Sequence, residues 1–115
     1  MPLIEVVAVE SGVNTVRVCR SLNAAVAAAI GARLEAVWST WHSIDVDVRG
    51  EEARTAGDGR PGRRPIVHVY HHRTTEQVDQ IVDSIKGVLA RELSIERDDV
   101  FVTTQPVEMP DPTLD

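Results

Sequence analysis

The sequence predicts an α+β fold in which duplicated βαβ units form a four-stranded sheet with two helices on one face. Two observations carry this prediction. One is an internal repeat with an offset of 63 residues, the spacing from Pro2 to Pro65, and the other is an alternation of strand and helix patterns within each copy. A length of 115 residues suits a single domain with one hydrophobic core.

The repeat keeps the apolar positions of both copies in phase. Pro2-Leu-Ile-Glu-Val matches Pro65-Ile-Val-His-Val. Five apolar positions of the first helix pattern fall, without a gap, on five of the second: Val18, Leu22, Ala25, Val26 and Ile30 on Ile81, Ile85, Val88, Leu89 and Leu93. A strand and a helix in register in both copies indicate a duplicated structural unit.

In the first copy, a strand is expected from Pro2 to Val9, because β-branched residues dominate and Pro is tolerated at a strand start. Asn14 is a candidate N-cap of the helix, and Gly31 suits the position just past its end. A second strand is expected over about residues 36–44.

In the second copy, a strand is expected from Pro65 to His72. Thr74 and Gln77 have the spacing of a capping box, which predicts a helix start, and the apolar stripe continues to Leu93. The last strand is expected over Val100 to Thr104.

These patterns divide the single domain into four parts. The first repeat spans about residues 2–48 and the second about residues 65–105. Residues 49–64 are polar and rich in Gly and Arg, so a loop is expected there, and residues 106–115 form a tail. The loop is no domain boundary, because neither repeat could bury its strand–helix face alone.

The composition narrows the classes of partner. A net charge of −6 and a pI near 5.1 argue against binding to nucleic acid. The single cysteine, Cys19, rules out an internal disulfide framework, and no stretch has the length of a membrane span. The first residues do not read as a signal peptide, and the histidines lack a zinc-site spacing. We therefore expect a cytoplasmic protein without metal, cofactor or membrane partner.

Helices on one face leave the other face of the sheet uncovered. Because this face carries Val and Ile among its polar residues, burial by oligomerisation is expected.

Two further segments point to a family. Arg73-Thr-Thr-Glu-Gln stands at a helix start, and Ile95-Glu-Arg-Asp-Asp-Val-Phe-Val leads into the last strand. Together with the Met-Pro-Leu-Ile-Glu-Val beginning and the duplication, they make the chain similar to the tautomerase superfamily of 4-oxalocrotonate tautomerase and macrophage migration inhibitory factor. The resemblance covers nearly the whole chain except residues 49–64 and the tail. It implies a homotrimer of two fused βαβ units per chain.

The resemblance also implies a base. With Met1 removed, Pro2 is a free secondary amine and the general base for keto–enol tautomerisation of a small 2-oxo or 2-hydroxy-enoate. An α-amino group titrates at about 7.7–8.0 in a peptide, and burial or nearby cations lower this pKa. A base that titrates near the working pH suits proton transfer between carbon and oxygen.

Arg73 and His72 are the substrate-binding residues that the resemblance implies. A guanidinium binds a carboxylate bidentately, so Arg73 is expected to hold the substrate carboxylate and polarise the neighbouring carbonyl. His72 is expected to donate a hydrogen bond or to shape the pocket. For His68 and His71, further back along the strand, a structural role is expected.

The chain also departs from the family. Residues 12–17 lack the family's Gly-Arg-Ser/Thr pattern, and Glu35 is out of register with the acidic residue of the decarboxylase. Thr103 stands where the dehalogenase has a catalytic Tyr. These departures favour simple tautomerisation. The alternatives are a hydratase, dehalogenase or decarboxylase of 3-carbon acids, and a non-catalytic ferredoxin-like binding module.

Four other side chains are prominent in the sequence. Trp38 and Trp41 fall on opposite faces of the second strand, where core or subunit-interface packing is expected. Arg63 and Arg64 precede the second repeat and are expected to be solvated loop charges.

Overall fold

The computed structural model of the chain describes residues 2–9, 12–58 and 64–107. Met1, Arg63 and most of the predicted tail lie outside the described residues. Six strands, two helices and two short 3₁₀ turns follow one another: β1 (Leu3–Val9), α1 (Thr15–Ile30), η1 (Leu34–Ala36), β2 (Trp38–Ile44), β3 (Val46–Arg49), β4 (Glu52–Thr55), β5 (Ile66–His71), α2 (Thr75–Leu93), η2 (Arg97–Asp99) and β6 (Phe101–Pro106).

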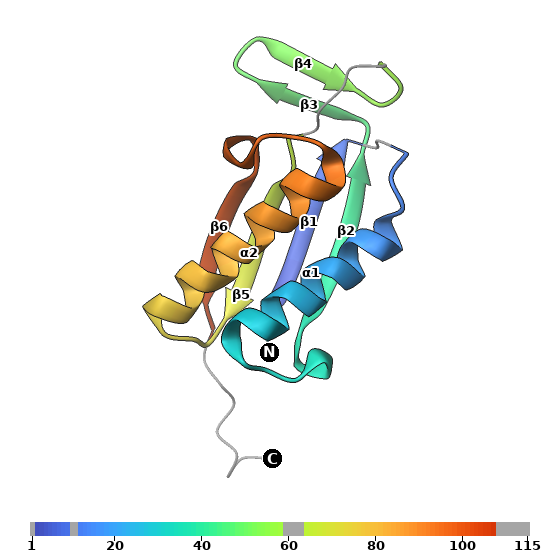
Figure 1. The fold of residues 1–115 in the computed structure, drawn as a ribbon. Coiled ribbons are helices and arrows are strands. Elements are labelled where there is room, and N and C mark those ends of the chain that lie inside the picture. The colour runs from blue at the N-terminus through green and yellow to red at the C-terminus, as the bar shows by residue number, and fades with distance from the viewer. Residues whose placement is uncertain (1, 10–11, 59–63, 108–115) are drawn as a thin grey trace.

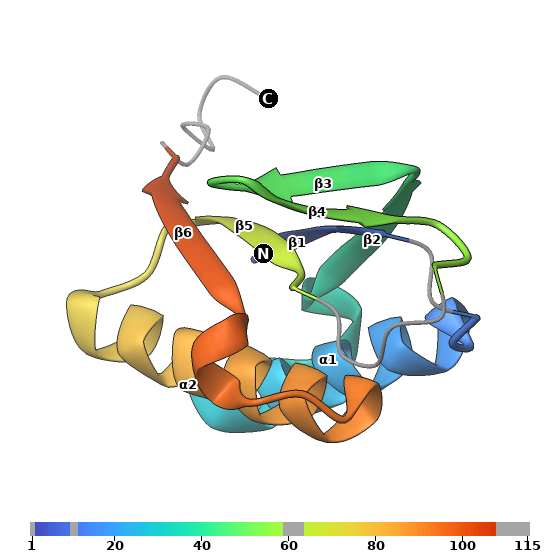
Figure 2. The same cartoon turned by 90° about the horizontal axis from the view of Figure 1, so that it is seen from above.

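The main sheet has the strand order β2-β1-β5-β6. Strand β2 runs parallel to β1 and β6 runs parallel to β5, whereas the two central strands are antiparallel. Both helices lie on one face of this sheet (Figures 1 and 2). The prediction of a duplicated βαβ fold is therefore confirmed. Because the strands of each unit are direct neighbours, the split βαβ topology of the ferredoxin-like alternative is wrong.

The internal repeat is visible in matching contacts. The Trp38 amide donates to the Pro2 carbonyl at 3.0 Å, and the Phe101 amide donates to the Pro65 carbonyl at 3.1 Å. Each pair is separated from the other by the same 63-residue offset that the sequence shows. The two units thus start their parallel strand pairing in the same way.

The predicted helix ends are confirmed by their caps. The Asn14 side chain accepts a hydrogen bond from the Arg17 amide at 3.1 Å. Thr74 and Gln77 form the capping box, with the Gln77 amide donating to the Thr74 hydroxyl at 3.3 Å. Gly31 ends α1 in the left-handed conformation, with φ of 66°.

The core lies between the sheet and the two helices. Alternate residues of the central strands point into it, namely Ile4 and Val6 of β1 and Val67 and Val69 of β5. They meet the buried stripes of both helices: Val18, Leu22 and Val26 of α1, and Ile81, Ile85, Val88, Leu89 and Leu93 of α2. The stripes that revealed the repeat are thus the packed faces of the helices.

The segment expected to be a loop contains most of a hairpin. Strands β3 and β4 pair antiparallel from Val46↔Thr55 to Arg49↔Glu52. Gly50 between them has φ of 62°, a conformation that suits glycine in a tight turn. The hairpin lies beyond one end of the main sheet (Figure 1), on the side away from the helices (Figure 2). The sequence did not predict this hairpin, because its residues are mostly polar and a strand is recognised by a pattern of buried apolar residues.

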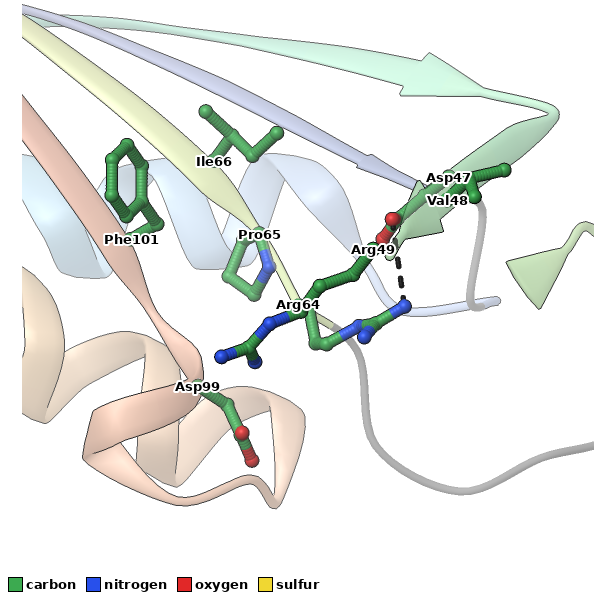
Figure 3. A pocket seen from close by; sticks show the side chains of 8 residues that line it. All are labelled: Asp47, Val48, Arg49, Arg64, Pro65, Ile66, Asp99 and Phe101. Atoms are coloured by element: carbon green, nitrogen blue, oxygen red, sulfur yellow. Dashed lines mark ion pairs between the residues drawn. The ribbon is translucent and has the colours of Figure 1, made fainter. Parts of the chain in front are cut away.

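Arg64 corrects a second expectation, that of a solvated loop charge. Its side chain is only 12% exposed and forms ion pairs with Asp47 of β3 at 3.5 Å and with Glu52 of β4 at 3.6 Å. The Arg64–Asp47 pair is drawn in Figure 3. Arg64 therefore helps to fix the hairpin to the beginning of β5.

The two tryptophans lie on opposite faces of β2, as predicted. Trp41 packs against the core, whereas Trp38 is 61% exposed on the face without helices. Ile66 and Phe101 are further large apolar side chains exposed on that face. This arrangement leaves an apolar sheet face that association would bury.

We predict that association depends on this open face. Val7 of β1 points to it between His42 and Ile66, so Val7→Lys would place a charge in the interface. The unchanged chain should sediment as an oligomer, and Val7→Lys should shift it towards monomer. Leu34→Lys, at an exposed apolar residue of η1, is the matched control. A stable wild-type monomer at micromolar concentration in sedimentation velocity would contradict the prediction.

Candidate active site

The pairing of the central strands places Pro2 next to the end of β5. Leu3 of β1 pairs with Tyr70 of β5, and continuing this antiparallel register by one residue sets Pro2 opposite His71. Directly opposed residues of an antiparallel pair have Cα atoms about 5 Å apart. The start of β1 therefore lies beside the segment in which His72 and Arg73 follow β5.

Pro2 is held at the edge of the core. Its ring is fully buried, and its carbonyl accepts a hydrogen bond from the Trp38 amide at 3.0 Å. An amine in such surroundings loses hydration, which disfavours its charged form.

His71 holds the turn after β5. It is 5% exposed, and its Nδ1 atom accepts a hydrogen bond from the Arg73 amide at 3.2 Å. Its carbonyl accepts from the Val107 amide at 2.7 Å. Because Nδ1 accepts, the proton of the neutral ring is on Nε2. His71 thus has the structural role expected for it, which includes fixing the backbone of Arg73.

Arg73 has an unused donor. Its side chain is half-buried, and its Nε atom is buried without a hydrogen-bond partner in the described part of the chain. A buried guanidinium nitrogen without an acceptor is costly, and a carboxylate from a ligand would satisfy it. The geometry is compatible with the carboxylate-binding role that the sequence predicts for Arg73.

His72 lies in a positive environment. Burial lowers the pKa of its imidazole, and the charges of the amino terminus, Arg73 and His71 lower this pKa further. His72 is accordingly neutral at pH 7, so its ring has one donor and one acceptor nitrogen.

Together, Arg73 and His72 bring a guanidinium and a neutral imidazole to the end of the sheet where Pro2 begins the first unit. If Pro2 has a free amine, such a set can move a proton next to a bound carboxylate. No group of three His, Cys, Asp or Glu side chains within residues 2–9, 12–58 and 64–107 has the arrangement of a metal site. Neither of the described helices has both the length and the apolar character of a membrane span.

Trp38 is a neighbour of Pro2, and the sequence did not predict this position. Its backbone pairs with Pro2, and its indole lies on the open face beside Leu3. Core or interface packing was expected for it. The repeat could have indicated this position, because Trp38 and Phe101 are equivalent residues, as are Pro2 and Pro65.

Other residues singled out in the sequence have local partners. Glu35 of η1 is exposed and pairs with Arg33 at 3.6 Å. The Thr103 hydroxyl is hydrogen-bonded to the His68 ring in the middle of the sheet, and His68 also meets Gln105 at 3.3 Å. The His68 contacts agree with the structural role expected for that residue.

We predict that the pKa of His72 lies below the ordinary value of about 6.5 and depends on its positive neighbours. Arg73→Gln, or an extension that moves the amino group away, should raise this pKa. Because the unfolded chain binds the proton more tightly, the His72 contribution to the free energy of unfolding is present above about pH 6.5 and lost as the pH falls. NMR titration of the imidazole signals measures both effects. An unchanged His72 titration in both variants would contradict the proposed neighbourhood.

Comparison with known proteins finds likeness in structure rather than in sequence. No protein-family model and no curated protein matches the chain. An asymmetric trimer of F6 fused 4-OT is similar with a TM-score of 0.78 and 15% identity, covering 96% of this chain and 92% of that one.

Two other similar structures carry different names. A macrophage migration inhibitory factor-like protein from Entamoeba histolytica has a TM-score of 0.70 and 9% identity over 92% of this chain and 88% of its own. Malonate semialdehyde decarboxylase has a TM-score of 0.66 and 18% identity over 92% of this chain and 84% of its own. The chain therefore has the duplicated βαβ fold of the tautomerase superfamily.

Proposed function

We propose that the protein is a tautomerase-like isomerase of the tautomerase superfamily that acts on a small 2-oxo or 2-hydroxy-enoate. Pro2, as the N-terminal residue after loss of Met1, is its general base. The observation that carries the proposal is the strand register, which places Pro2 beside the His71–Arg73 segment. A buried guanidinium donor without a partner supports it at the same place.

In the proposed reaction Pro2 transfers one proton. The neutral amine takes the proton of the 2-hydroxyl group of the enol, and the O–H electron pair forms the carbonyl. The carbon–carbon double bond shifts, and the protonated amine returns the proton to the substrate carbon. No atom is gained or lost, so no cofactor is needed.

Arg73 binds the carboxylate next to the reacting centre. Its planar fork donates hydrogen bonds to both carboxylate oxygens, and its charge stabilises the negative charge that develops on the 2-oxygen. This role satisfies the Nε donor that has no partner in the described chain. His72, neutral because burial and neighbouring positive charges lower its pKa, supplies a hydrogen-bond donor or acceptor without adding a further charge.

The same surroundings suit Pro2 to its task. The buried ring and the Arg73 charge both disfavour the protonated amine, so its pKa falls below that of an exposed terminus. A base whose pKa lies near neutral pH is present in part as the free amine and is still basic enough to take the proton.

The structural likeness to malonate semialdehyde decarboxylase, whose described activities are decarboxylase and hydratase, supports a second candidate reaction on 3-carbon acids. Glu35, the acidic residue nearest to the expected catalytic position in the sequence, is exposed and paired with Arg33. We therefore rank tautomerisation first. A panel of 2-hydroxydienoates, phenylenolpyruvate and halogenated acrylates separates these reactions from each other and from a non-catalytic module.

We propose a homotrimer as the assembly and the cytoplasm as the location. The apolar open face of the sheet supports association, and three of the similar fused 4-OT structures are described as trimers. The lone Cys19 suits a reducing compartment.

If Pro2 is the base, activity on an enol substrate requires its free nitrogen. The chain without Met1 should be active, with kcat/KM falling tenfold per pH unit below a pKa under about 8. A residue kept or added ahead of Pro2 makes this nitrogen a peptide amide and should abolish the reaction. Intact mass establishes which form is assayed, and Pro65→Ala, at the equivalent position of the second repeat, is the control. Equal rates for the free and the extended chain would exclude Pro2 as the base.

Arg73→Ala should reduce kcat/KM by about 2–4 kcal/mol of transition-state stabilisation, the scale of losing one charge-stabilising donor. Arg73→Lys should recover only part of the loss, because an ammonium lacks the bidentate fork. Arg33→Ala, at an arginine that is 90% exposed, is the matched control. An unchanged kcat/KM in Arg73→Ala would remove this residue from the site.

A further inference from the structure

The backbone at Arg73 is held by two side-chain acceptors. Residues 72–74 lie between the end of β5 and the start of α2. The Arg73 amide donates to Nδ1 of His71 at 3.2 Å, and the next amide, that of Thr74, donates to Oε1 of Gln77 at 3.5 Å. These two hydrogen bonds determine the direction of the chain at Arg73, and with it the place from which the guanidinium extends.

His71 connects this junction to the strands around the candidate site. Its side chain is 5% exposed, and its carbonyl accepts a hydrogen bond from the Val107 amide, just after β6, at 2.7 Å. Its backbone lies opposite Pro2 when the register of β1 with β5 is continued by one residue. A side chain packed in the interior has little room to shift. His71 is therefore a fixed point between the proposed base and the proposed carboxylate anchor.

The sheet itself does not require an imidazole at this position. The equivalent residue of the first repeat is Ala8, which is equally buried at 2% exposure. A buried imidazole is unfavourable unless it is hydrogen-bonded, and the bond that His71 accepts at Nδ1 comes from Arg73. The imidazole thus stabilises the junction that carries Arg73 rather than the packing that the two repeats share.

We infer that His71 is a positioning residue: it sets the place of the Arg73 guanidinium relative to Pro2 and thereby the preference for substrates with a carboxylate. His71 acts through the Arg73 backbone and does not touch the substrate. The buried Nε of Arg73, which has no partner in the described part of the chain, is the donor whose position depends on it. Displacing a binding group by about 1 Å can cost a hundredfold in rate. The inference deepens the proposed function and rests on it.

Hydrogen exchange of the Arg73 amide, followed by NMR on the full chain without substrate, tests the hydrogen bond itself. His71→Leu keeps a side chain of similar size in the core but removes the acceptor, so this amide should exchange about tenfold faster or more. His71→Asn offers its Oδ1 atom as an acceptor in place of Nδ1, so the amide should stay protected. Equal exchange in the unchanged chain and in His71→Leu would overturn the inference, whatever the activity.

The substrate preference is measured with phenylenolpyruvate and its methyl ester, which share the reacting enol. In His71→Leu the ratio of kcat/KM for the acid to that for the ester should fall about tenfold or more, whereas His71→Asn should keep most of the ratio. The control is Asn14→Ala, at the residue equivalent to Gln77, which removes the cap of α1 and destabilises the chain away from the site. An unchanged ratio in His71→Leu, or an equal loss in Asn14→Ala, would exclude the positioning role.

A double variant tests whether His71 acts through Arg73. Adding His71→Leu to Arg73→Ala should not lower the acid-to-ester ratio further, and an additional loss would overturn the inference. If neither compound is converted by the unchanged chain, the proposed isomerase is wrong. The ratio is then taken from the affinities for 3-phenylpropanoate and its methyl ester. A loss confined to the acid in His71→Leu would still support the positioning of Arg73, and equal losses for both probes would overturn it.

Discussion

The antiparallel pairing of β1 with β5 is the contact on which the rest of the molecule depends. Each βαβ unit alone has an exposed inner strand edge and a half-covered apolar face, which a single parallel pair cannot stabilise in water. When the two inner edges pair, their backbone groups are hydrogen-bonded. The apolar face is then covered as well, because α1 and α2 pack side by side over one sheet. The same register brings the first residue of each unit beside the end of the first strand of the other. Pro2 thereby reaches His71, and Pro65 reaches Ala8 when the pairing is continued by one residue.

This internal symmetry makes the differences between the two sheet ends chemically meaningful. Both ends offer a buried proline whose carbonyl pairs with an aromatic residue of the neighbouring strand. At the first end the proline can become the chain terminus, and a guanidinium with an unpaired donor follows β5. At the second end the proline is locked in a peptide bond, and Arg64 is occupied by the carboxylates of the hairpin. Duplication thus gives two similar strand beginnings, of which only the one at Pro2 can carry a basic nitrogen.

The features that the sequence predicted correctly are those that depend on local patterns. Strand alternation, the helix stripes and the Thr74–Gln77 cap depend on neighbours within a few residues, and the strand and helix patterns occur in both repeats. The hairpin of β3 and β4 and the burial of Arg64 depend on contacts across the fold with Asp47 and Glu52, so no local period could indicate them. For the candidate site, the motif drew attention to Pro2, His72 and Arg73. Their proximity became visible only from the register of β1 against β5.

His71 links the core to the candidate site. Its counterpart in the first repeat is Ala8, so the second repeat has an imidazole at a core position where the first has a methyl group. Burying a polar ring is unfavourable unless it is hydrogen-bonded, and here Nδ1 receives the Arg73 amide. That bond exists only while Nδ1 is unprotonated, because a doubly protonated ring has no acceptor. The position of Arg73 therefore depends on the Nδ1 acceptor of His71, a side chain that the first repeat lacks.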